Sequence, residues 1–430
     1  MKPLLAAALL LAATAPAVAD AVTYEGRLGD STIGVEFAED PGEAPVFGRY
    51  FYARKGIDIP LHGMDREAHR FTVQEERPCT LDTCSTDEDG NISEPPDLGP
   101  VWDLARAEDG KTLLGTWTDG TTTLPVQLTP IGSRPFAIMP ESTISQLVEA
   151  GSYLGRNGDL LTPDMSPYET LKMRSLGRMA ESDTAEMAGS HFNYVTDPRT
   201  EIAFPRVVAL ADGSDTDPIN ASLEARHWAM NADALQCAGM QYPALGWAEW
   251  NAYAAGTLGG YEGELLTVNY LSPTVLSYTQ SGSLFCGGAH PFNHISTINL
   301  DVETGAQLDL SRIFTFWMPM QGGIVVEDLD AARANPGSIV WGPEPVFVDF
   351  LREKRTRSTD ATFEEECGID DLIPEYLSVG FREGDRVVFS LGTLPHAIQA
   401  CADELYEAPI AELMEWLAPT AAAYFPSLLK

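Results

Sequence analysis

Short runs in which apolar and polar residues alternate fill residues 20–132, and turn residues separate them. Gly29-Asp30 divides the first two runs, and Asp40-Pro41-Gly42 divides the second from the third. Closely spaced runs of this kind, with almost no helical periodicity, predict an all-β domain that folds as a small barrel or sandwich. The expected strands cover residues 22–28, 32–37, 45–52, 57–61, 70–74, 101–105, 113–118 and 124–128.

The pattern becomes helical after residue 132. A helix is expected over residues 143–156, and Ser166-Pro167-Tyr168-Glu169 is typical of a second helix start. Ser166 supplies an N-cap, Pro167 fits the first helical position, and Glu169 closes a capping box. We expect this second helix to run to about residue 188, and residues 133–200 to form a helical connecting segment.

Residues 201–430 combine both periodicities and predict an α+β domain with an antiparallel sheet and packed helices. A strand at residues 201–210 precedes Asp217-Pro218, which begins a helix with apolar residues at helical spacing. His227 lies on the apolar face of that helix, which favours a buried structural histidine. Further strands are expected at residues 265–278, 297–300, 377–381 and 386–391.

The first 19 residues match a secretory signal peptide. Lys2 is followed by an apolar run at residues 4–13, and Ala17-Val18-Ala19 offers small residues at a cleavage site. No later stretch is long and apolar enough to span a bilayer. We therefore expect an exported bacterial protein, periplasmic or secreted, with no membrane span in the mature chain.

Six cysteines fit an oxidising compartment, where disulfides are the default. Their number allows 15 pairings, and the sequence does not select one. Proximity along the chain favours Cys79–Cys84, Cys237–Cys286 and Cys367–Cys401.

The chain is strongly acidic. It has 27 Lys and Arg against 63 Asp and Glu, a formal charge of −36. Such a charge argues against nucleic acid and anionic lipid as partners, and it favours basic partners, cations or a saline surrounding.

Two stretches of the second half resemble a known family. Residues 283–291 read SLFCGGAHP, and a strand-like run, the turn Glu303-Thr304-Gly305 and residues 308–314 follow. This succession, with the chain end around Leu394-Pro395-His396, resembles the extracytoplasmic domain of lysozyme-binding anti-sigma factors, over about residues 200–418. A similar domain lies beside some peptidoglycan deacetylase domains.

The resemblance implies an α+β envelope domain that binds a protein or glycan without chemistry of its own. The chain departs from those factors because a signal peptide and a β domain replace their cytoplasmic segment and membrane helix, so sigma regulation is not expected. The N-terminal part, with Tyr24-Glu25-Gly26 and residues 48–52, resembles β domains of uncharacterised bacterial exported proteins.

Candidate chemistry is sparse. His290 and His294 have a spacing that suits a metal pair, but no third ligand follows at a fixed short distance, so structural roles are favoured. Residues 85–92 resemble half of a calcium loop, yet Pro96 stands where the last carboxylate belongs. We therefore assign no metal, no cofactor and no catalytic residue.

The aromatic cluster Trp247, Trp250, Tyr242 and Tyr253 suits either stacking on sugar rings or packing between helix and sheet, and packing is favoured. His290, His294, Trp247 and Trp250 are the candidate binding residues. The expected function is an exported cell-envelope binding protein for a basic protein such as lysozyme or for wall glycan. An exported hydrolase with a site near His290 and a structural envelope protein are the alternatives.

Overall fold

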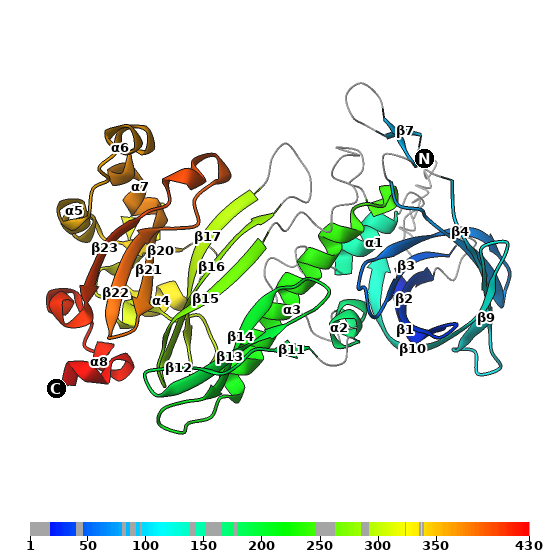
Figure 1. Ribbon diagram of the computed structural model, residues 1–430, viewed down its shortest axis with the longest axis horizontal. Coiled ribbons are helices and arrows are strands. Elements are labelled where there is room, and N and C mark those ends of the chain that lie inside the picture. Colours follow the sequence, from blue (N-terminus) through cyan, green and yellow to red (C-terminus); the bar gives the residue numbers. More distant parts are fainter. Residues whose placement is uncertain are drawn as a thin grey trace, which may run out of the picture. The chain divides into compact units, whose positions relative to one another are not determined.

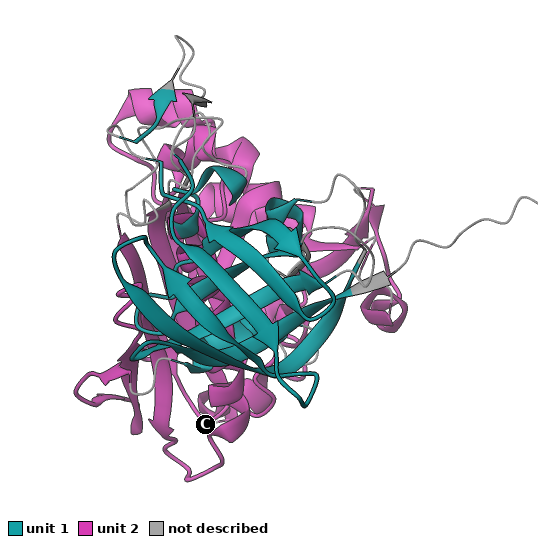
Figure 2. Ribbon diagram, turned by 90° about the vertical axis from the view of Figure 1, so that its right-hand side faces the viewer, with its two compact units in different colours: residues 1–176, 239–255 teal, residues 177–238, 256–430 magenta. Residues whose placement is uncertain are grey.

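The chain divides into two compact units (Figures 1 and 2): unit 1 comprises residues 1–176 and 239–255, and unit 2 comprises residues 177–238 and 256–430. The computed structural model describes residues 18–39, 46–79, 83–86, 92–94, 97–137, 143–151, 166–175, 179–245, 263–284, 292–322, 324–334, 337 and 339–429. Residues 1–17 of the expected signal peptide thus lie outside the described part.

Unit 1 contains a closed barrel of eight antiparallel strands in the order β1-β10-β9-β8-β5-β4-β3-β2 (Figure 1), which confirms the predicted β domain. Every expected strand is present. The barrel strands are β1 (Val18–Leu28), β2 (Ser31–Glu39), β3 (Phe47–Tyr52), β4 (Ile59–Arg66), β5 (Arg70–Glu75), β8 (Val101–Arg106), β9 (Leu113–Thr118) and β10 (Thr123–Ala137). A separate short pair is formed by β6 (Ser85–Thr86) and β7 (Ile92–Glu94).

Alternation along each strand fills the barrel. In β2, Ile33, Val35 and Phe37 join one buried apolar cluster, while Glu36 between them points to the other face. The cluster also contains Trp102 of β8 and Leu128 of β10. The interior of the barrel is therefore a packed core.

The outer face of the barrel carries a buried ionic cluster. Arg49 of β3 contacts Glu36 at 2.9 Å, Asp58 at 3.0 Å and Glu169 at 2.8 Å, and all four side chains are buried. Two more buried cations complete the cluster: Arg134 binds Glu36 at 2.8 Å, and Lys172 binds Asp58 at 2.8 Å.

Among the residues of unit 1 that the structure describes, the helices are α1 (Ile144–Gly151) and α2 (Pro167–Arg174), with a short 3-10 turn η2 (Pro243–Leu245). Helix α2 begins where expected, but it ends at Arg174 rather than near residue 188. The predicted continuation of this helix forms the strands β11 (Ala180–Glu181) and β12 (Ala185–Met187) instead, and both pair with β13 (Ser190–Thr196). The expected helical connecting segment, residues 133–200, is therefore not helical throughout.

Within its described residues, unit 2 contains four antiparallel sheets. The first consists of β11 (Ala180–Glu181), β12 (Ala185–Met187), β13 (Ser190–Thr196) and β14 (Ala203–Ala209). The second consists of β15 (Gly263–Leu271), β16 (Val275–Leu284) and β17 (Phe292–Asp301). The third consists of β18 (Trp317–Gln321), β19 (Ile324–Val325) and β20 (Val340–Pro343). The fourth consists of β21 (Leu377–Arg382), β22 (Arg386–Leu391) and β23 (Glu404–Pro409).

Helices cover these sheets, and two apolar cores result. Ile219 and Leu223 of α3 share a core with Leu266 and Tyr278 of the β15–β16–β17 sheet. The other core surrounds Phe389 of β22 and the residues packed against the β21–β22–β23 sheet. The helices are α3 (Asp217–Gly239), α4 (Leu329–Ala334), α5 (Pro345–Lys354), α6 (Ala361–Cys367), α7 (Ile369–Tyr376) and α8 (Ala421–Tyr424), with 3-10 turns η3 (Leu310–Arg312), η5 (His396–Cys401), η6 (Ile410–Trp416) and η7 (Pro426–Leu429). In the described part of the chain, no helix has the length and apolar character needed to cross a membrane.

Cysteine pairing fits an oxidising compartment. Cys79 is bonded to Cys84, and Cys367 to Cys401, as proximity along the chain predicts. Cys237 is disulfide-bonded as well, and its expected partner Cys286 lies outside the described residues.

Candidate functional site

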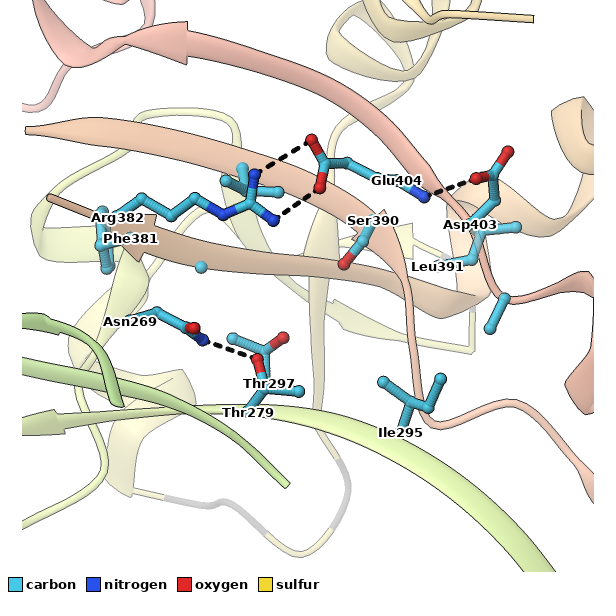
Figure 3. Close-up of a pocket in the computed structure, with 13 residues that line it drawn as sticks. Asn269, Thr279, Ile295, Thr297, Phe381, Arg382, Ser390, Leu391, Asp403 and Glu404 are labelled. Atoms are coloured by element: carbon cyan, nitrogen blue, oxygen red, sulfur yellow. Dashed lines mark hydrogen bonds and ion pairs between the residues drawn. The ribbon is translucent and has the colours of Figure 1, made fainter. Parts of the chain in front are cut away.

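A wedge-shaped cleft opens within unit 2 between the β15–β16–β17 sheet and the β21–β22–β23 sheet (Figure 3). At the narrow end the two sheets are joined by hydrogen bonds. Asn299 Nδ2 donates to the carbonyl of Val379 at 2.7 Å, and the backbone N–H of Phe381 donates to Ser277 Oγ at 3.2 Å. Both polar side chains are buried, and they are cross-strand neighbours.

The first wall is a row of hydroxyl groups. One step outward from the narrow end, Thr267, Thr279 and Thr297 lie opposite one another on the three strands. The next row outward holds Leu265 and Ile295, whose side chains are 63% and 40% exposed. Exposure rises along these successive rows, and at the outer row the backbone N–H of Thr393, just after β22, donates to the carbonyl of Ile295 at 2.8 Å.

Gly380 lets the second sheet come close to this wall. A Cβ atom at that position would lie 2.9 Å from Thr297 Cγ2. A larger residue there would push β21 away from the threonine row and change the shape of the cleft.

The second wall carries an array of arginines and glutamates. Arg382 of β21 contacts Glu404 at 2.6 Å and Glu407 at 2.5 Å, both on β23, and Arg386 of β22 also binds Glu407. Figure 3 shows the Arg382–Glu404 pair opposite Thr279 and Thr297. The hydrogen bonds from Arg386 and Arg382 hold the pKa of Glu407 below its usual range. The array is therefore charged at neutral pH.

Several polar atoms of the cleft are available to a ligand. The cleft measures about 290 Å³. Among the described residues, neither the Thr297 hydroxyl nor the Ser390 hydroxyl has a hydrogen-bond partner, whereas Thr279 Oγ1 accepts a bond of 2.7 Å from Asn269. The cleft thus presents hydroxyl and amide groups on one side and planar charged groups on the other.

Sequence reasoning did not single out these lining residues. Alternating hydroxyl residues along β16 are a signal, but they become informative only once the pairing of the strands is known. Arg382 and Glu404 are 22 residues apart in sequence, and nothing in their local pattern links them.

His294, which sequence reasoning did single out, lies on the other face of the same sheet. It neighbours Ile295 in β17, and adjacent strand residues point to opposite faces. Its Nε2 lies 3.0 Å from Glu264 Oε1. The same oxygen accepts a hydrogen bond of 2.7 Å from Gln280 Nε2. His290, Trp247 and Trp250 lie outside the described residues, so their binding role stays a prediction.

His227 and Tyr242, two other residues that the sequence analysis considered, are both buried in packed surroundings. His227 is buried, as its place on the apolar face predicts, and its ring stacks on Phe204 at 5.2 Å. Tyr242 is buried in an apolar cluster with Ile144 and Leu245. Its place there agrees with packing as the role of this aromatic residue.

Metal binding has no site in the part of the chain that the structure describes, since no group of three His, Cys, Asp or Glu residues is arranged around a common point there. Most of the calcium-like loop, residues 87–91, falls outside that part.

Comparisons with known proteins give little. Neither the models of protein families nor the curated proteins include a match. One similar solved structure is a member of the DUF3298 family from Bacteroides fragilis, with 16% identity and a TM-score of 0.29. The match covers 56% of this chain and 94% of that one. A likeness this weak assigns no family and no function, and the resemblance to the anti-sigma factor domain stays a prediction.

Proposed function

We propose that this protein is an exported binding protein of the cell envelope and that the cleft of unit 2 holds a wall glycan strand. The observation that carries the proposal is the pairing of two unlike walls. Thr279, Thr297 and Ser390 offer hydroxyl groups. Arg382 and Glu404 bond to each other through two atoms each, and these planar groups retain further N–H groups and lone pairs. Planar groups of this kind match neighbouring hydroxyls of a sugar ring, and bonds to charged groups are the stronger ones.

Export is supported by the signal-peptide pattern and by the disulfides. The cleft lies just below the size range of small-molecule sites, ~300–1,000 Å³. That size suits one or two sugar units of a longer chain.

Calorimetry with an N-acetylglucosamine tetramer, compared with a maltose-type glucose tetramer, tests the proposal. The wild type should bind the amino-sugar tetramer. Thr297→Val and Ser390→Ala should each weaken binding about two- to tenfold, the effect of one lost hydrogen bond. Neither change removes an internal hydrogen bond, so the fold should persist. Thr196→Val on β13, which is outside the cleft, should bind like the wild type. A wild type that binds no wall glycan would contradict the proposal.

A basic protein such as a c-type lysozyme is a second candidate partner, favoured by the charge of −36. Attraction of this kind speeds encounter and weakens with salt. Calorimetry with lysozyme should show binding at low salt that falls as salt rises, and no heat at low salt would exclude this partner.

A further inference from the structure

A second hollow of about 460 Å³ adjoins the cleft. It is lined by the loop that joins α5 to α6, including Thr356, Ser358 and Thr359. Asp403 and Glu404, at the start of β23, line both hollows. A ligand that fills the cleft therefore has a neighbouring space across these two residues.

This loop is firmly anchored. The backbone N–H of Thr356 donates to the carbonyl of Leu405 on β23 at 2.8 Å. Arg355, which is buried, binds Asp370 at 2.6 Å and Glu364 at 2.6 Å. The second hollow is thus shaped by elements held in place, as a binding subsite requires.

The charges around the second hollow do not cancel. Glu404 is paired with Arg382, and Arg357 is paired with Asp370 at 3.3 Å. Asp403 accepts a hydrogen bond of 2.9 Å from the backbone N–H of Glu404 (Figure 3), and within the described ranges no cation lies within ion-pair distance of it. Asp360 accepts from backbone N–H groups at the start of α6. Asp403, where the hollows meet, and Asp360, in the second hollow alone, therefore remain without a cation.

We infer that an extended glycan passes from the cleft over Asp403 into the second hollow, and that a free amino group on the chain pairs with Asp403. This inference rests on the proposed glycan function and adds to it a preference for chains that carry unacetylated amino sugars. The hydroxyls of Ser358 and Thr359 would then form hydrogen bonds with the sugar unit beyond Asp403.

The test compares two probes of equal length, a glucosamine tetramer and an N-acetylglucosamine tetramer, by calorimetry at mildly acidic pH where the amine is protonated. The wild type should bind the glucosamine tetramer about two- to fivefold more tightly, the effect of a partly exposed ion pair. Asp403→Asn should lose this preference while it still binds the acetylated tetramer. Asparagine keeps the acceptor for the Glu404 N–H, so the start of β23 is preserved.

A charge-matched control separates a local contact from the overall negative field. Asp183→Asn, on the exposed segment between β11 and β12, should keep the preference. A preference that survives Asp403→Asn, or equal binding of both tetramers to the wild type, would overturn the inference and leave the glycan function intact. Failure of both tetramers to bind would overturn the glycan function itself.

Discussion

Glu264 and His294 form a hydrogen bond of 3.0 Å across the width of a three-stranded sheet, although the middle strand lies between them. Gly282 occupies the position between the two residues, opposite Glu264 on one side and His294 on the other. A Cβ atom there would lie 2.0 Å from Glu264 Oε2. The contact therefore exists because residue 282 has no side chain.

Gly282→Ala should destabilise unit 2 by about 1–3 kcal/mol, because the methyl group displaces a buried carboxylate from its two donors. Urea unfolding measures the change. Gly263→Ala on the neighbouring strand is the control, since a Cβ there meets nothing within 4 Å. Equal effects of the two substitutions would contradict the steric explanation.

The barrel was predictable because each strand shows the alternation of apolar and polar residues within its own sequence. Ile33, Val35 and Phe37 alternate with polar or small residues, and the turn residues mark the strand ends, so local pattern and fold agree. The length of α2 was not predictable from its start. The residues after it form β11 and β12, and their pairing with β13 does not show in the local pattern.

The cleft could not be predicted from the sequence, because it depends on contacts between distant parts of the chain. Its walls come from strands about 100 residues apart, and Thr279 faces Thr297 only through the register of β16 and β17. His294 was recognised as a candidate, but its partner Glu264 lies 30 residues earlier. Short-range motifs such as H-x-x-x-H do not report pairing across a sheet.

His227 should make unit 2 acid-sensitive. Burial, and then the Arg206 charge, lower its pKa from 6.5 to about 4. The unfolded chain therefore binds a proton on His227 between these values, and the folded chain does not. Stability is unaffected above pH 6.5 and falls as pH drops from 6.5 toward 4, by on the order of 3 kcal/mol.

Urea unfolding of the wild type and His227→Gln at neutral pH and near pH 4.5 measures this difference. Glutamine gains no charge, so the variant should lose less stability on acidification. Carboxylates such as Glu364, whose pKa the Arg355 hydrogen bond lowers to about 2, contribute stability that is lost only below about pH 4.5. An identical acid response in both proteins would show that His227 is not responsible.

Arg49→Met should destabilise the barrel unit by about 3–5 kcal/mol, because Glu36, Asp58 and Glu169 would remain buried with fewer cations. Arg27→Met, at a side chain that is 60% exposed, should change stability by less than about 1 kcal/mol. Denaturation curves for the two variants make the comparison, and a small effect of Arg49→Met would contradict the importance of the cluster.

Glu75 should affect stability with pH in the opposite sense to His227. Its Oε1 accepts from Tyr50 at 2.8 Å, from Trp102 at 2.8 Å and from Trp117 at 2.6 Å, while burial raises its pKa. The folded state therefore favours the protonated form, so this group costs stability as pH rises above its unfolded pKa.

Glu75→Gln keeps an acceptor for the three donors and should be at least as stable as the wild type at pH 7. Glu75→Leu leaves the donors unpaired and should be less stable by about 1–3 kcal/mol or more. Tryptophan fluorescence during unfolding distinguishes the two variants.

Methyl NMR of isoleucine side chains, during titration with the N-acetylglucosamine tetramer, tests most directly whether the cleft is the binding site. Ile295 lines the cleft and is 40% exposed, whereas Ile33 is buried inside the barrel. The Ile295 signal should shift with added glycan while the Ile33 signal stays in place. Binding that leaves Ile295 unchanged would show that the glycan is held elsewhere.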